Sequence, residues 1–301
     1  MNSIELKSRA KINLSIDVLG KRQDGYHLVE MIMQTIDLFD IIKIFPLNED
    51  KIIIRSNSED IPTDSSNIVH KAASLIKQKF VIKKGIDIYI EKNIPVAAGM
   101  AGGSSNAAAV LLGLNKLWNL NLSKDELKEF GLILGADVPF CIEGQASLAE
   151  NIGEKLTNID GLSDNVFILI CKPELFVSTK EVYESLDSKI IEKRPDNKLL
   201  IKLLKENNIE ALAKNMYNVL EVVTKEKYPV IKQVEEIMIN NNALGAMMSG
   251  SGPTVFGLYN NRFDAEKTRE ILLENFKQVY LVKSHKKGVE INGEFNKDKL
   301  R

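Results

Sequence analysis

A glycine-rich segment at residues 94–109 constrains this chain more than any other stretch of its sequence. It reads Ile-Pro-Val-Ala-Ala-Gly-Met-Ala-Gly-Gly-Ser-Ser-Asn-Ala-Ala-Ala, after a predicted strand and before a predicted helix. Glycines let the backbone take positive φ angles and approach a ligand closely. Ser104, Ser105 and Asn106 add hydroxyl and capping groups at the helix start, where free amides and a positive dipole end attract anions. We therefore expect a phosphate site here; a flexible turn with a capped helix is the simpler alternative.

Other phosphate-binding sequences are absent from the chain. It contains no Gly-x-x-x-x-Gly-Lys-Ser/Thr, which excludes the P-loop nucleoside triphosphatases. It also lacks the His-Arg-Asp and Asp-Phe-Gly sequences of protein kinases. Gly250-Ser251-Gly252 resembles the start of a dinucleotide-binding sequence, but the third glycine is missing. If the glycine-rich segment binds phosphate, the chain must belong to a different class of nucleotide-binding protein.

The composition argues against nucleic acids and membranes as partners. Forty basic residues balance 41 acidic ones, the net charge is −1, and the charges are dispersed along the chain. Two cysteines are too few for a disulfide framework, and neither has metal-ligand spacing. No apolar signal core or membrane-length run occurs. We expect a soluble, cytoplasmic protein, and the sequence leaves monomer and homodimer open.

Two α+β domains are predicted, at residues 1–160 and 161–301, with a polar, glycine-containing boundary near 158–165. In the first, residues 11–18 alternate as a strand with one polar face, and residues 86–91 form the strand that leads into the glycine-rich segment. In the second, strands and helices follow in the order βαββαβ, which is a ferredoxin-like unit. The charged tail from His285 onward is expected to be loosely held.

Asp137 and Lys11 are the candidate catalytic side chains. Asp137 follows the helix-ending Gly135 and precedes Pro139, so by itself it reads as a turn cap or as a general base. Lys11 shares the polar strand face with Asn13. A cation beside a carboxylate holds it ionised, whereas the simpler alternative for Lys11 is a solvated surface lysine.

Five segments in order resemble the GHMP kinases, the superfamily of galactokinase, homoserine kinase and mevalonate kinase. They are Ala10 to Leu14, Asp24-Gly25-Tyr26-His27, Pro95 to Ala109, Gly135 to Pro139, and Met248 to Phe256. The resemblance spans nearly the whole chain. It implies the two-domain α+β GHMP kinase fold, with a ribosomal S5 domain 2-like N-terminal domain and a ferredoxin-like C-terminal domain.

The resemblance also implies ATP-dependent phosphoryl transfer with Mg²⁺. Asp137 would be the base, Lys11 would assist it, and Asn67 and Lys92 would contact the adenine side. No acidic metal-ligand cluster occurs, so we assign no protein side chain to the metal. The residues that would hold the ATP phosphates are Pro95, Val96, Ala97, Ala98, Gly99, Met100, Ala101, Gly102, Gly103, Ser104 and Ser105. Ala97, Ala98 and Ala101 replace glycines common in the family, and since alanine disfavours positive φ, they limit which residues can turn.

Within the superfamily, the second and fourth segments resemble the branch that phosphorylates the 2-hydroxyl of a cytidine diphosphate-linked methylerythritol, in the non-mevalonate route to isoprenoid precursors. The resemblance implies that Asn13 binds the polyol, His27 reads the cytosine edge, and Tyr26 and Tyr183 flank the ring. The alternatives are another GHMP kinase, of homoserine or mevalonate type, and a catalytically silent ligand sensor on the same fold. Intact Lys11 and Asp137 argue against a sensor.

Overall fold

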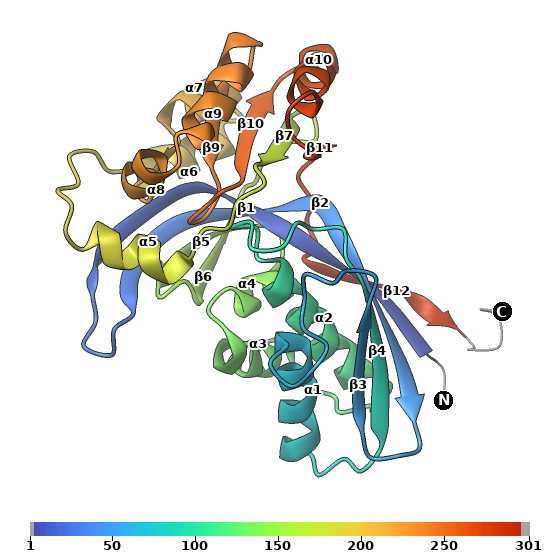
Figure 1. The fold of residues 1–301 in the computed structure, drawn as a ribbon. Coiled ribbons are helices and arrows are strands. Elements are labelled where there is room, and N and C mark those ends of the chain that lie inside the picture. Colours follow the sequence, from blue (N-terminus) through green and yellow to red (C-terminus); the bar gives the residue numbers. More distant parts are fainter. Residues whose placement is uncertain (1–2, 296–301) are drawn as a thin grey trace.

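The structure is a computed structural model that describes residues 3–295, in which two β-sheets and ten helices form two lobes. Two long strands, β1 (Ser3–Lys21) and β2 (His27–Leu47), run through the molecule and pair along their whole length (Figure 1). The polar face expected for residues 11–17 exists, but it is buried.

The larger sheet has eight strands in the order β12–β1–β2–β4–β3, with β5 beside β2, β6 beside β5 and β8 beside β1. The first half of β2 pairs with β5 and its second half pairs with β4. The remaining strands of this sheet are β3 (Ile52–Ser56), β4 (Gly85–Glu91), β5 (Ala146–Asn151), β6 (Lys155–Ile159), β8 (Tyr217–Asn218) and β12 (Val289–Phe295).

Four helices pack with this sheet around one core: α1 (Ile68–Lys79), α2 (Gly102–Leu117), α3 (Lys124–Leu134) and α4 (Val138–Glu143). Helix α2 lies closest to the strands, because its small residues let the backbones approach. Ala107, Ala108 and Ala109 are fully buried, and a Cβ on Gly113 would lie 2.6 Å from Cδ1 of Ile44. Helix α2 begins directly at the glycine-rich segment, so the core fixes the position of that segment.

The smaller sheet has the order β11–β7–β10–β9 with every neighbouring pair antiparallel. The chain passes through these strands and the connecting helices in the order βαββαβ. The predicted ferredoxin-like arrangement is therefore confirmed. Its strands are β7 (Phe167–Lys172), β9 (Gly245–Met248), β10 (Val255–Tyr259) and β11 (Gln278–Val282). The helices of this lobe are α5 (Thr179–Leu186), α6 (Asn197–Lys205), α7 (Ile209–Asn215), α8 (Glu221–Lys227), α9 (Val230–Asn240) and α10 (Arg262–Leu273).

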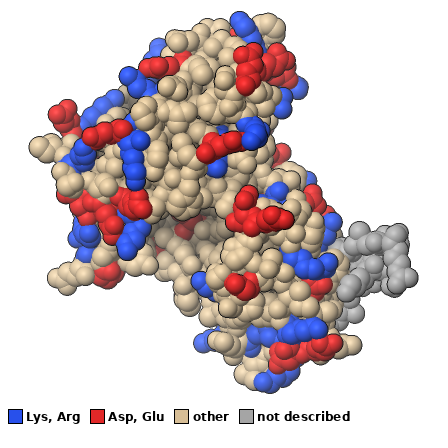
Figure 2. All heavy atoms as spheres, in the orientation of Figure 1, with Lys and Arg blue, Asp and Glu red and all other residues tan. Residues whose placement is uncertain are grey.

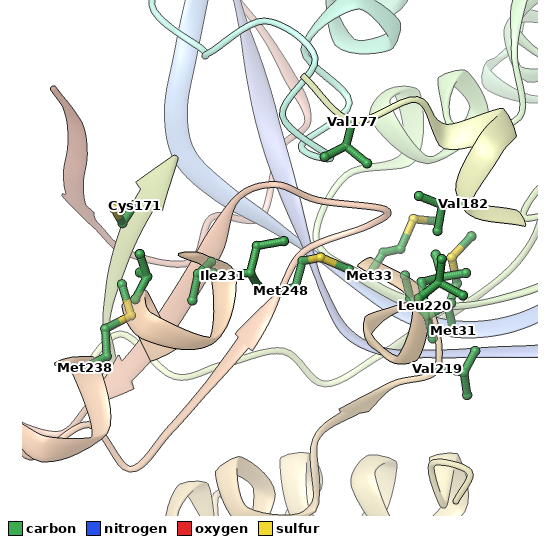
Figure 3. Close-up of a cluster of buried hydrophobic side chains, with 14 of the residues drawn as sticks. Met31, Met33, Cys171, Val177, Val182, Val219, Leu220, Ile231, Met238 and Met248 are labelled. Atoms are coloured by element: carbon green, nitrogen blue, oxygen red, sulfur yellow. The ribbon is translucent and has the colours of Figure 1, made fainter. Parts of the chain in front are cut away.

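One apolar cluster joins the two lobes. It brings Met31 and Met33 of β2 together with Val182 of α5, Leu220 before α8 and Met248 of β9 (Figure 3). The two sheets with their helices confirm the predicted two-domain fold. The boundary between residues 160 and 161 stays a prediction. Two strands from beyond that boundary, β8 and β12, add to the larger sheet.

The expectation of a loosely held tail from His285 was wrong for residues 285–295, and residues 296–301 lie outside the described residues. Residues 289–295 form β12, which pairs antiparallel with the first residues of β1, and Arg9 N donates to Gly288 O at 2.8 Å. A charged sequence can still form an edge strand because only its backbone needs to pair.

The face of the molecule in Figure 2 carries Lys and Arg interspersed with Asp and Glu. Within residues 3–295, the structure contains no helix that is long and apolar enough to cross a membrane.

Gly288 provides a test of how the tail is held. A Cβ there would lie 2.0 Å from the carbonyl oxygen of Cys141 in α4, and backbone cannot yield to it cheaply. We expect Gly288→Ala to lower the free energy of unfolding by about 1–3 kcal/mol. In Gly20→Ala the new Cβ meets nothing within 4 Å, so this control should change it by less than about 0.5 kcal/mol. Urea unfolding of both variants measures the difference, and equal effects would contradict the packing.

Glu143 at the end of α4 provides a second test. Burial raises the pKa of Glu143, but hydrogen bonds from two lysines and Asn158 outweigh it and hold the pKa at about 2. The lysines are Lys124, with Nζ 2.9 Å from Oε1, and Lys128, with Nζ 3.2 Å from Oε2. Because the pKa is depressed on folding, the stabilisation is complete above the ordinary glutamate pKa of about 4.3 and is lost as the pH falls toward 2.

We therefore expect Glu143→Gln to cost about 1–2 kcal/mol at pH 7 and about half as much at pH 3, midway through the range in which the stabilisation is lost. Urea unfolding at the two pH values measures this difference, with Glu129→Gln on the exposed face of α3 as the control. A cost that is the same at both pH values would refute the role of the charge.

Candidate active site

One cavity of about 1140 Å³ lies between the lobes and collects nearly all the side chains that the sequence singled out. This volume exceeds that of most single-ligand pockets. The predicted site residues that line it are Lys11, Asn13, Tyr26, His27, Asn67, Lys92, Pro95, Val96, Ala97, Ala98, Gly99, Ala101, Gly102, Gly103, Ser104, Asp137 and Tyr183. Met100 and Ser105 do not line it: both are buried, at 1% and 0% exposure.

The glycine-rich segment turns at different residues from those expected. Ala97 and Ala101 take positive φ angles of 50° and 55°, and Gly99 takes 69°. Gly102 and Gly103 lie inside α2. A left-handed alanine costs about 1–2 kcal/mol, so the surrounding packing imposes this shape on the segment. The first residues of α2, whose amides have no partner within the helix, consequently line the cavity, as an anion site requires.

The expected cap at this helix was wrong. Helix α2 starts at Gly102, its N-cap residue is Ala101, and no side chain caps it. Because the helix starts two residues earlier than the serines suggest, Ser105 is fully buried. Asn106 accepts from Ser8 Oγ at 2.8 Å and lies at the wall of the cavity. Of the two serines in the glycine-rich segment, Ser104 lines the cavity and Ser105 does not.

Lys11 is a buried cation at the centre of the site. Its Nζ donates to Asn13 Oδ1 at 2.7 Å and to Gly99 O at 3.1 Å, and it lies 3.9 Å from Asp137 Oδ2. Lys11 is only 5% exposed. The alternative of a solvated surface lysine therefore does not hold.

Asp137 is the N-cap residue of α4, yet its side chain makes no capping hydrogen bond. The carboxylate is instead part of the cavity wall, about one third exposed, beside the Lys11 ammonium. Its negative charge also reaches across the cavity: burial raises the pKa of Tyr183, and the charge of Asp137 adds to that shift.

Lys92 and Asn67 line the cavity and also have structural partners. Asn67 caps α1 by accepting from Val69 N at 2.8 Å. Lys92 Nζ donates to Asp40 Oδ2 at 2.7 Å. Burial lowers the pKa of Lys92, and the charge of Asp40 opposes that effect.

Asp40 was not anticipated from the sequence. It is fully buried, and its Oδ1 accepts from Asn93 N and Ile94 N, each at 2.7 Å. It thereby fixes the entry to the glycine-rich segment. The sequence offered only a weak sign of this role, which is an aspartate within an apolar strand. A carboxylate in such a strand can be buried only if it has hydrogen-bond partners.

The turn at residues 249–253 packs directly on the glycine-rich segment. Ser249 Oγ donates to Gly99 O at 3.1 Å, and a Cβ on Gly250 would lie 2.8 Å from that same oxygen. Two residues that the sequence did not single out hold this turn. Asn218 Nδ2 donates to Met248 O and Gly250 O, and Glu221 Oε1 accepts from Met248 N at 2.7 Å.

At the other end of the cavity, His27 and Tyr183 lie in contact. Their ring centroids are 4.9 Å apart, with planes inclined by 40°. Tyr26 is 58% exposed and also lines the cavity. His27 Nε2 lies 2.7 Å from Oδ1 of Asp187, another residue that the sequence left out. The structure thus places aromatic and hydrogen-bonding groups at one end and the glycine-rich segment at the other.

Comparison with known proteins agrees with this layout. The family model described as "GHMP kinases N terminal domain" matches residues 67–145. The model described as "GHMP kinases C terminal" matches residues 200–278. The 4-diphosphocytidyl-2-C-methyl-D-erythritol kinase of Clostridioides difficile (strain 630) is 66% identical over 98% of this chain and 100% of its own length. The kinase of that name from Caldicellulosiruptor bescii is 53% identical over 92% of this chain and 97% of its own.

Solved structures give the same result. The crystal structure of 4-(cytidine 5'-diphospho)-2C-methyl-D-erythritol kinase is 28% identical, covers 93% of this chain and 99% of its own, and superposes with a TM-score of 0.79. Homoserine kinase from Cytophaga hutchinsonii, at 18% identity and a TM-score of 0.77 over 97% and 98% of the two chains, shares the fold. This chain therefore belongs to the GHMP kinase family, among its 4-diphosphocytidyl-2-C-methyl-D-erythritol kinases.

Proposed function

We propose that this enzyme transfers the γ-phosphoryl group of ATP to the 2-hydroxyl of 4-diphosphocytidyl-2-C-methyl-D-erythritol, in the non-mevalonate route to isoprenoid precursors. The observation that carries the proposal is the Lys11–Asp137 pair beside the glycine-rich segment, in the same cavity as His27 and Tyr183. The cavity offers an anion site for ATP, a base, and an aromatic end suited to a pyrimidine.

Asp137 accepts the proton of the 2-hydroxyl as the oxygen bonds to the γ-phosphorus, and the bond to the ADP oxygen breaks. Lys11 lies 3.9 Å from Asp137, so its positive charge favours the ionised carboxylate and the developing alkoxide. Asn13, which accepts from Lys11 and lines the cavity, contacts the acceptor polyol in this proposal. The amides at the start of α2 bind the phosphates of ATP, and Ser104 adds a hydroxyl.

The nucleobases bind at opposite ends of the cavity in this proposal. Asn67 and Lys92 lie on the adenine side, next to the entry of the glycine-rich segment. His27, Tyr26 and Tyr183 bind the cytosine. Placing the two bases apart leaves the γ-phosphate and the 2-hydroxyl to meet at Lys11 and Asp137.

Mg²⁺ enters with ATP in this proposal. Within residues 3–295 no group of three or more His, Cys, Asp or Glu side chains could hold a metal ion. Mg²⁺ commonly binds through one or two carboxylates together with phosphates and water, and the oxygens of Asp137 and Ser104, which line the cavity, fit that donor set. When bound, the ion neutralises charge on the phosphates. We further propose a cytoplasmic enzyme that acts on small molecules only, as a monomer or a homodimer.

Replacement of Asp137 tests the base. We expect Asp137→Asn to lower kcat about 10²–10⁴-fold, because the amide cannot accept the proton. ADP release with ATP and Mg²⁺ measures it, on the cytidine compound, homoserine and mevalonate in parallel. Asp125→Asn, an exposed aspartate on α3, is the matched control. Wild-type turnover on homoserine or mevalonate alone would overturn the substrate proposal while leaving the base in place.

Replacement of Gly99 tests the phosphate site. A Cβ there would lie 2.2 Å from Ser249 O, and φ is positive. We expect Gly99→Ala to lower kcat/KM for ATP at least tenfold, because the segment must move away from the turn at 249–253. Gly20→Ala serves again as the control, and circular dichroism confirms folding. An unchanged KM and kcat would show that the segment does not hold the phosphates.

A further inference from the structure

Two residues of one helix hold the imidazole of His27. Tyr183 and Asp187 lie four positions apart at the end of α5, so they project from the same face of the helix. The Tyr183 ring packs against the imidazole, with centroids 4.9 Å apart, and Asp187 Oδ1 lies 2.7 Å from Nε2. The His27 side chain is only 9% exposed. The ring is therefore fixed both in plane and in position.

Asp187 is bound on both of its oxygens. Its Oδ2 accepts from Lys21 Nζ at 2.6 Å, and Lys21 pairs with His27 across the β1–β2 ladder. Hydrogen bonds from Lys21 and then His27 lower the pKa of Asp187, so the group is a carboxylate and can only accept. The hydrogen between Asp187 and His27 must consequently belong to Nε2.

The second ring nitrogen has a defined role as a result. A neutral imidazole carries one hydrogen, and if that hydrogen is on Nε2, Nδ1 has a lone pair and can only accept. Nδ1 of His27 makes no hydrogen bond to any of the described residues. His27 also lines the cavity, so a ligand there can reach it.

We propose that Asp187 is a positioning residue that fixes the Nε2–H tautomer of His27, and that the acceptor Nδ1 thereby selects a base with an amino group over one with a carbonyl at the same place. Cytosine carries an amino group where uracil carries a carbonyl oxygen. Two acceptors facing each other leave both unpaired, and a site built for a hydrogen bond rejects such an analogue strongly. The inference rests on the proposed function for the identity of the base.

The tautomer can be measured on the free enzyme without any substrate. The chain has three histidines, so long-range ¹H–¹⁵N correlation spectra resolve His27 beside His70 and His285. At pH 8 we expect an Nε2–H tautomer for His27 in the wild type and a mixture of tautomers in Asp187→Ala. An Nδ1–H tautomer in the wild type would overturn the proposal, and this reading needs no variant to fold.

Kinetics test the consequence for specificity. We compare kcat/KM for the cytidine compound with that for its uridine counterpart. Asp187→Ala should lower the cytidine-to-uridine ratio at least tenfold, mainly through KM, while kcat at saturation changes little. Lys189→Met breaks the exposed pair with Glu226 in the same segment and should leave the ratio and the activity unchanged.

The outcomes separate two kinds of failure. If Asp187→Ala raises KM for both compounds equally and keeps the ratio, Asp187 supports only the structure of α5 and the proposal is wrong. If the wild type turns over neither compound, the proposed function fails, while the tautomer spectra still decide whether Asp187 sets the imidazole of His27.

Discussion

The carbonyl oxygen of Gly99 is the point at which the two lobes and the buried Lys11 side chain meet. It accepts from Lys11 Nζ and from Ser249 Oγ, each at 3.1 Å. This shared acceptor places the glycine-rich segment, the central strand β1 and the turn of the smaller sheet in one arrangement. The close approach is possible only because residues 99 and 250 are both glycines. The position of Lys11 relative to Asp137 follows from it.

Behind this contact lies a chain of buried polar groups. Asn218 and Glu221 hold the backbone around Met248, and Asp40 holds the entry to the glycine-rich segment from the other side. Buried polar groups of this kind need all their partners, so each fixes several backbone atoms at once. These hydrogen bonds hold the glycine-rich segment in place from both sides, whereas the aromatic end depends on α5 and on the link of Asp187 to Lys21 and His27.

The local parts of this structure could be predicted from the sequence, and the long-range parts could not. The glycine-rich turn before a helix, the shared face of Lys11 and Asn13, and the ferredoxin-like lobe all follow from short-range patterns. The roles of Asp187 and Asn218 could not be predicted, because Asp187 binds His27 and Asn218 binds the Met248 carbonyl, each more than 25 residues away in the chain. The positive φ angles of Ala97 and Ala101 were missed for the same reason, since packing overrides the local preference of alanine. Pairing of β12 with β1 likewise joins the two ends of the chain.

The central claim is that one cavity brings the γ-phosphate and the 2-hydroxyl together at Lys11 and Asp137, with the cytosine at His27. The most direct measurement is a crystal structure with a non-hydrolysable ATP analogue, Mg²⁺ and 4-diphosphocytidyl-2-C-methyl-D-erythritol. The account predicts the 2-hydroxyl within about 3.2 Å of an Asp137 oxygen and in line with the γ-phosphorus. It also predicts the triphosphate on the amides at the start of α2. A hydroxyl turned away from Asp137, or a base bound away from His27, would contradict it.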